Sequence, residues 1–167
     1  MANDTAIKTH RYDPYRTFRF QIEIDGTSVA GMRKMTALKK TTEAVAWRTG
    51  GDQTHERKLP GGTKFEPVTL EQGLTMDTTF EDWANKVNKL NDKMSLATFR
   101  KNIVIKVMNL QGEVAISYNL YDAWVSEYQA LPDLDAGTTN AVGIQSIKIE
   151  HEGWERNTEI KDDTLRG

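Results

Sequence analysis

The sequence contains no cysteine, and its three histidines are widely separated at His10, His55 and His151. The absence of thiols excludes disulfides, thiolate nucleophiles and cysteine-ligated zinc or iron–sulfur centres. The histidines form no H-x-H or H-E-x-x-H motif, so no spacing in the chain indicates a metal site. We therefore expect no metal centre and no sulfur chemistry.

Long apolar runs and an excess of one charge sign are also missing. No apolar segment approaches the ~20 residues of a membrane-spanning helix, so we expect no membrane insertion by this chain. The 22 basic and 24 acidic residues give a formal net charge of -2, which provides no general positive field for a nucleic-acid backbone. The N-terminal segment is polar and lacks the apolar stretch of a secretory signal, so we expect synthesis in a cytoplasm without a signal peptide.

Recognisable catalytic motifs are absent as well. There is no G-x-S-x-G sequence, and the residues around Gly61, Gly62 and Lys64 do not follow the order of a phosphate-binding loop. Asp133 and Asp135 form a D-x-D pair, but the segment lacks the other oxygen ligands of a calcium loop, and we interpret the pair as turn capping. We therefore expect no enzyme, no catalytic residue and no cofactor.

The sequence does contain a series of alternating apolar and polar residues, which predicts β-strands. The first run has an apolar residue at every second position from Phe18 to Ile24 and ends at the turn pair Asp25-Gly26. Similar patterns predict further strands at residues 29–38, 41–49, 65–74, 100–110, 113–124 and 142–151. The first three strands are expected to form a meander, and those at 100–110 and 113–124 a hairpin.

A change to helical periodicity follows near residue 78. Apolar residues share one helical face over about residues 78–91, and Thr78 with Glu81 has the capping-box pattern. The residues predicted to pack into the core from this face are Phe80, Trp83, Val87 and Leu90. The fold class expected from these elements is mostly β with one α-helix, in which two antiparallel sheets form a β-sandwich or β-barrel with the helix across one end.

The segment from Gly50 to Lys64 differs from the strands around it. It is rich in charge, contains Pro60-Gly61-Gly62, and has almost nothing to bury except Leu59, so we expect it to project from the body. Edge strands of a β domain are pairing surfaces, and their common use is to add neighbouring copies in a ring or a filament. Self-assembly is therefore the leading functional class.

Several segments, in order over nearly the whole of residues 13–156, resemble the tail tube proteins of contractile phages. They are DPYRTFRFQIEIDG at 13–26, RTGGDQTHERKLPGGTKF at 48–65, YNLYDAWV at 118–125, LPDLDA at 131–136 and IKIEHEGWER at 147–156. The resemblance implies a single tail-tube domain at 13–156, with an N-terminal arm at 1–12 and a polar C-terminal tail at 157–167. It also implies a tube-protein fold whose copies close into a hexameric ring.

The resemblance further implies a structural protein whose hexameric rings stack into the inner tube of a contractile injection machine. Such a machine is a phage tail, an R-type bacteriocin or an extracellular contractile injection system, and the haemolysin-coregulated protein of type VI secretion has a more distantly related fold. The tube is a conduit for DNA or a protein effector inside a contractile sheath. The implied partners are further copies of the chain, the sheath protein, and baseplate and tail-terminator proteins. The implied final location is a virion tail or a released particle.

Two assembly sites follow from the resemblance. The family's projecting loop reaches a neighbouring ring, so ring-stacking contacts are expected at Gly50, Gly51, Asp52, Glu56, Arg57, Lys58, Leu59 and Pro60. Contacts between subunits are expected at Tyr12, Asp13, Pro14 and Tyr15, with ordinary core packing of the two tyrosines as the alternative. The alternative for the loop is a plain surface hairpin. The alternative for the whole chain is a monomeric or single-ring tail terminator or baseplate connector of the same fold.

Overall fold

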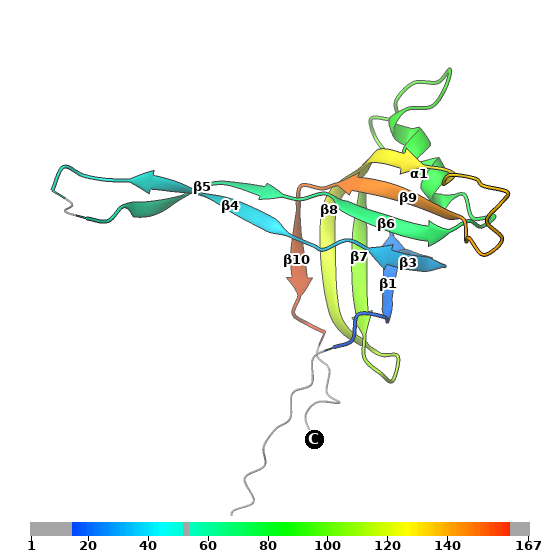
Figure 1. Ribbon diagram of the computed structural model, residues 1–167, viewed down its shortest axis with the longest axis horizontal. Helices are drawn as coiled ribbons and strands as arrows, with labels where there is room; N and C mark the ends of the chain where they lie inside the picture. The colour runs from blue at the N-terminus through cyan, green and yellow to red at the C-terminus, as the bar shows by residue number, and fades with distance from the viewer. Residues whose placement is uncertain (1–14, 52–53, 161–167) are drawn as a thin grey trace, which may run out of the picture.

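The computed structural model describes residues 15–51 and 54–160, which form ten β-strands and one α-helix (Figure 1). The strands before the helix are β1 (Phe20–Ile24), β2 (Thr27–Val29), β3 (Met32–Met35), β4 (Lys40–Trp47), β5 (Arg57–Phe65) and β6 (Val68–Gly73). The helix and the strands after it are α1 (Thr79–Val87), β7 (Lys101–Met108), β8 (Val114–Gln129), β9 (Ile144–Glu150) and β10 (Gly153–Asn157). The chain is thus mostly β with one helix, as predicted.

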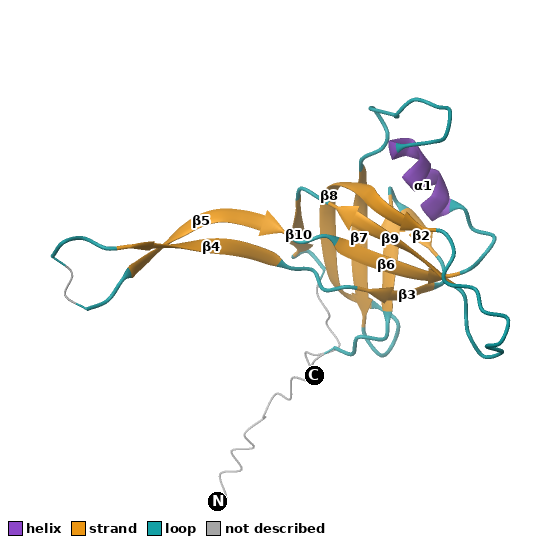
Figure 2. Ribbon diagram, turned by 45° about the horizontal axis from the view of Figure 1, so that its top comes forward, coloured by secondary structure: helices purple, strands orange, loops and turns teal. Residues whose placement is uncertain are grey.

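Eight of the strands form one antiparallel sheet in the order β2-β1-β7-β8-β9-β6-β3, with β10 also paired to β8. The long strand β8 joins two halves of this sheet, because residues 114–123 pair with β7 and residues 124–129 pair with β9. In Figure 1, β7 and β10 run vertically while β6 and β9 run across them. Strands β4 and β5 form a second, separate sheet of two strands (Figure 2).

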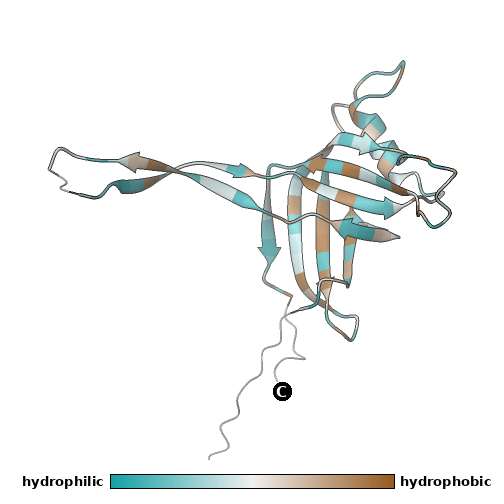
Figure 3. Cartoon of the chain, viewed as in Figure 1, coloured by the Kyte–Doolittle hydropathy of each residue, from teal (hydrophilic) through white to brown (hydrophobic). Residues whose placement is uncertain are grey.

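The core lies between the two halves of the large sheet and is built by alternation along its strands. Ile22 and Ile24 of β1 are buried, and so are Ile147 and Ile149 of β9, whereas the residues between them are only partly covered. The bands of alternating hydropathy are visible along these strands in Figure 3. Each such aliphatic side chain contributes about 1.5–3 kcal/mol when fully buried. The further buried apolar residues are Val29, Val68, Leu70, Phe80, Trp83, Ile103, Ile105, Ala115, Leu120, Ala123 and Val125.

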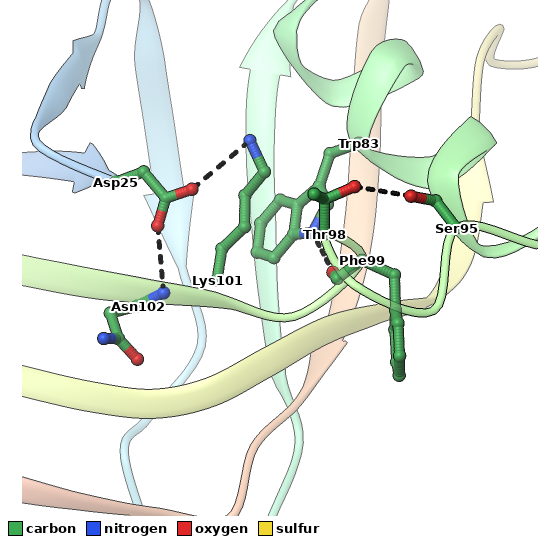
Figure 4. Close-up of polar contacts among 7 residues, drawn as sticks. All are labelled: Asp25, Trp83, Ser95, Thr98, Phe99, Lys101 and Asn102. Carbon is green, nitrogen blue, oxygen red and sulfur yellow. Dashed lines mark hydrogen bonds and ion pairs between the residues drawn. The ribbon is translucent and has the colours of Figure 1, made fainter.

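Helix α1 packs against β8 and covers one end of the core. Phe80 and Trp83 are 0% and 1% exposed, in agreement with their predicted place in the core. The Trp83 indole Nε1 donates a hydrogen bond to the carbonyl oxygen of Phe99 at 2.8 Å, which satisfies its one polar atom (Figure 4). The ammonium of Lys101 lies 5.9 Å from the centre of the Trp83 ring and 3.7 Å from a carboxylate oxygen of Asp25. These contacts join the helix to the start of β7 and to the β1–β2 turn.

The helix is shorter than predicted, and the assignment of Leu90 to its core face is wrong. The helix ends at Val87, which is half-buried, and Leu90 lies beyond it with 88% of its surface exposed. Asn88 has an extended conformation and Asn91 a positive φ of 63°. Asparagine side chains compete with helical hydrogen bonds and tolerate the left-handed region, so this polar stretch ends the helix in spite of the apolar spacing.

The predicted capping box also does not form. Thr78 makes no side-chain capping bond, and its hydroxyl instead donates to Asp82 at 2.9 Å. The carboxylate of Asp77 takes the capping role, because its Oδ1 accepts a hydrogen bond from the backbone N–H of Thr79 at 3.0 Å. The acceptor at the helix N-terminus is therefore supplied from outside the helix.

The expected meander of the first three strands is wrong. Strand β1 pairs with the short β2, but β3 pairs with β6 and β4 pairs with β5, so the runs at 18–24, 29–38 and 41–49 are not successive neighbours in a sheet. Strand β2 has only three residues, and Gly31, with a φ of 72°, lies in the turn that carries the chain to the other half of the sheet. Strand β4 has no buried face, so it has nothing to pack into the body.

Candidate assembly interface

The arm, defined as residues 40–65, extends away from the body of the protein as a two-stranded hairpin (Figures 1 and 2). Every residue of β4 is exposed, and Phe65 is the one residue of β5 that is partly buried. An isolated two-stranded hairpin has no interior and is marginally stable in water. The arm is therefore the element of the described chain that most clearly requires a surface other than its own.

One face of the outer half of the arm is apolar. Val45 lies opposite Leu59 and Trp47 opposite Arg57, so these side chains project from the same face. Val45, Trp47 and Leu59 are 47%, 45% and 51% exposed. The Arg57 guanidinium carbon lies 5.9 Å from the centre of the Trp47 ring, which places a cation at the end of this apolar strip.

The root of the arm is fixed to the body by an aromatic cluster. The Phe65 ring lies 5.9 Å from the ring of His151 and 6.5 Å from that of Trp154, measured between centres. The ammonium of Lys40 lies 5.5 Å from the Trp154 ring centre. His151 Nε2 is 3.0 Å from the carbonyl oxygen of Glu66. The direction of the arm is thus set by contacts at the corner between β9 and β10.

A further group of polar contacts joins residues at the root of the arm. The Glu66 carboxylate lies 3.3 Å from the Lys39 ammonium and accepts a hydrogen bond from the Thr41 hydroxyl at 3.5 Å. The backbone N–H of Glu66 donates to the carbonyl oxygen of Lys39 at 3.0 Å. Since these groups are well exposed, their ion pair contributes little free energy. The aromatic cluster is therefore the main contact between the root of the arm and the body.

The predicted ring-stacking residues lie in the outer part of the arm. Gly50, Gly51 and Glu56 are exposed in the segment that connects its strands, whereas Asp52 lies outside the described residues. The sequence places residues 57–60 in a projecting loop. In the structure they form the exposed start of strand β5 instead, as Arg57, Lys58, Leu59 and Pro60. Proline is tolerated there because Pro60 pairs with Ala44 next to an irregularity in register, in a strand with a free edge. Four residues near the N-terminus are predicted to contact other subunits. Of these, Tyr12, Asp13 and Pro14 lie outside the described residues, and Tyr15 is half-buried.

The end of the molecule opposite the arm exposes apolar side chains that the sequence patterns did not single out. Two segments meet there, because the backbone N–H of Leu74 donates to the carbonyl oxygen of Gly143 at 3.0 Å. Figure 1 shows the connections from β6 to α1 and from β8 to β9 at this end. The large apolar residues exposed in the two segments are Leu74, Met76, Leu131, Leu134 and Val142.

The described residues hold no group of three or more histidine, aspartate or glutamate side chains placed to bind a metal ion. Within the same ranges, no helix combines the length and the apolar composition needed to cross a membrane.

Comparison with solved structures shows which proteins share this fold. A chain of the cap that terminates the tube of the anti-feeding prophage is 23% identical, with a TM-score of 0.76 over 94% of this chain and 99% of that one. A chain of the PVC sheath–tube complex, an extracellular contractile injection system in its extended state, is 22% identical. The match has a TM-score of 0.72 and covers 89% of this chain and 94% of that one. Hcp1 from Flavobacterium johnsoniae is 12% identical, and the match has a TM-score of 0.55 and covers 83% of this chain and 94% of that one.

Comparison with families of sequences gives the assignment. No match was found among curated proteins. The model of the T4-like virus tail tube protein gp19 family matches residues 16–155, which include every described strand from β1 to β9, the helix and most of β10. The fold, the projecting arm and this match agree, and the chain belongs to the T4-like virus tail tube protein gp19 family.

Proposed function

We propose that this chain is the protomer of the inner tube of a contractile injection machine. Copies close into hexameric rings with a barrel-like wall, and the rings stack into a hollow tube. The family assignment supports a structural role in a tail tube, and the arm is the observation that carries the stacking. Its strands expose apolar side chains that only another molecule can cover.

The remaining parts of the proposal concern partners and place. One solved structure with this fold is described as a sheath–tube complex, another as a sheath and tube terminator, and another as a baseplate. By analogy, the tube of this chain is enclosed by a sheath protein and bounded by baseplate and terminator proteins. It serves as a passive conduit for DNA or a protein effector, without enzymatic activity or cofactor, and it belongs to a phage tail or a phage-tail-like particle assembled from protein made in a bacterial cytoplasm.

Assembly of the purified chain tests the proposal directly. Negative-stain electron microscopy and sedimentation over a concentration series are expected to show rings and hollow tubes. A variant in which residues 43–62 are replaced by Asn-Gly joins Thr42 to Thr63, which already lie opposite each other, through a two-residue hairpin turn. This variant is expected to keep the circular dichroism and thermal unfolding of the body but to form no tubes.

The outcomes separate the two candidate functions. Tubes from the full chain and none from the shortened variant support an inner-tube protomer that stacks through the arm. Single rings that do not stack at any concentration would favour the terminator or connector function. A chain that stayed monomeric at every concentration and salt, and was absent from any particle, would overturn both.

A further inference from the structure

We propose that the apolar face of the arm, formed by Val45, Trp47 and Leu59, docks on the receiving loops of a second copy of this chain. The receiving loops are residues 74–78 and 130–143, at the end of the molecule opposite the arm. The apolar contact, rather than the charges of the arm, holds successive copies together. This inference rests on the proposed function and specifies the surfaces that the stacking uses.

The two faces of the arm differ in a way that indicates which one is covered. Val45 and Leu59 project from one face, whereas Ala44 and Ala46 occupy the other. A side chain at Gly61 would come within 3.1 Å of the Val45 methyl Cγ2, so glycine at this position lets Val45 lie close to the backbone. The larger apolar side chains of the outer arm are thus gathered in one strip, whereas the opposite face carries the two alanines with Pro60 and Lys58 across from them.

The receiving loops are matched to the arm in chemistry. They expose apolar residues, of which Met76 is 99% and Val142 78% exposed. They contain three aspartates, Asp77, Asp133 and Asp135, and no basic residue. The arm, by contrast, has five basic and three acidic residues over 40–65, so it carries a net positive charge that favours approach to the receiving loops.

The positions of the two surfaces make a second copy the fitting partner. The arm and the receiving loops lie at opposite ends of the long axis in Figure 1, so one copy cannot close the contact within itself. A contact between different patches of identical molecules is heterologous, and each added copy again presents a free arm and free loops. This is the geometry that repeated stacking requires.

The apolar residues are expected to carry more of the contact than the charges do. Exposed ion pairs are worth little and are screened by salt, whereas the burial of half-exposed valine, leucine and tryptophan side chains is not weakened by salt. The dependence of assembly on salt therefore separates the two contributions.

A matched pair of variants tests the face of the arm. The double variant Val45→Ser, Leu59→Ser removes apolar side chains from the proposed face, and Ala44→Ser, Ala46→Ser introduces the same residue type on the opposite face. We expect the first to raise the concentration needed for tube growth at least about tenfold, at low and at high salt alike, and the second to leave it nearly unchanged. Equal effects of the two variants, or none from the first, would overturn the inference while tubes of the unmodified chain still supported the proposed function.

Cross-linking tests the partner surface. Because the chain has no cysteine, Leu59→Cys and Met76→Cys can each be made alone and the two proteins mixed, and a short bis-maleimide is expected to join them in tubes. A mixture of Leu59→Cys with Gln111→Cys, an exposed position in the β7–β8 turn, is the control. Cross-linking no stronger than in the control would overturn the assignment of the receiving loops as the surface on which the arm docks. An unmodified chain that stayed monomeric at every concentration and salt, and was absent from any particle, would overturn the proposed function and the inference together.

Discussion

At the scale of single residues, the packing of the core depends on side chains that several contacts hold in place at once. Trp83 shows this most clearly, since it is 1% exposed, its indole N–H is bonded to Phe99, and the Lys101 ammonium lies over its ring. Leu90 has similar spacing in the sequence but lies in solvent. The pattern of apolar residues alone cannot distinguish them, because the end of the helix depends on the conformations of Asn88 and Asn91.

Replacing Trp83 by alanine is expected to lower the free energy of unfolding by about 3–5 kcal/mol, because it leaves a cavity beneath α1 and an unpaired carbonyl at Phe99. Leu90→Ala is the control and is expected to change it by less than about 0.5 kcal/mol. Chemical denaturation of the two variants measures both values. A similar loss in the two would mean that the loop after α1 is packed in solution.

Asp77 makes the stability of helix α1 depend on pH. Hydrogen bonds from the Thr79 hydroxyl and backbone N–H, with a smaller contribution from Gln72, hold the pKa of the Asp77 carboxyl below its ordinary value of 3.8. A carboxyl with a lowered folded-state pKa adds stability that is complete above its unfolded pKa and is lost as the pH falls through the folded one. The contribution of Asp77 should therefore persist from neutral pH down to about pH 4 and disappear below it.

Asp77→Ala is expected to lower the free energy of unfolding by about 1 kcal/mol at neutral pH, through loss of the acceptor at the start of α1. The difference from the unmodified chain should narrow as the pH is lowered below the ordinary pKa of the carboxyl. Thermal unfolding of both proteins between neutral and acidic pH measures this. A difference that stayed constant down to the most acidic pH would show that the charge of Asp77 is not responsible.

At the scale of elements, the accuracy of the sequence-based predictions follows burial. The patterns at 18–24, 100–110 and 142–151 predict β1, β7 and β9 close to their positions, because one face of each strand is buried and the other is not. The pattern at 113–124 predicts the start of β8 but ends five residues before Gln129. The sequence of residues 57–64 predicts a loop, because a strand exposed on both faces shows no alternation and Pro60-Gly61-Gly62 is typical of turns. Glu155 and Arg156 gave no strand signal for the same reason, although β10 pairs with β8. The receiving loops have no periodicity, so only the fold reveals that they lie together.

The charges of the arm provide an element-scale prediction. Arg57→Glu with Lys58→Glu reverses two exposed charges and is expected to change the free energy of unfolding by less than about 0.5 kcal/mol. The variant should slow tube growth at low salt, and the effect should decrease as salt is added. Lys89→Glu with Lys93→Glu, in the exposed loop after α1, is the control for net charge. Equal inhibition by the two pairs in light-scattering assays of growth would show that the arm has no special electrostatic role.

At the scale of the whole molecule, the path of the chain from the arm into the body has a mechanical consequence. Figure 1 shows β5 running toward the body and β6 continuing in nearly the same direction. Strand β6 is hydrogen-bonded along its length to β9, and on its other side to β3. These bonds lie across the strand direction. Tension applied to the arm is therefore carried in shear by many bonds at once instead of peeling them apart in turn, so the fold resists being pulled open along the axis in which the arm points.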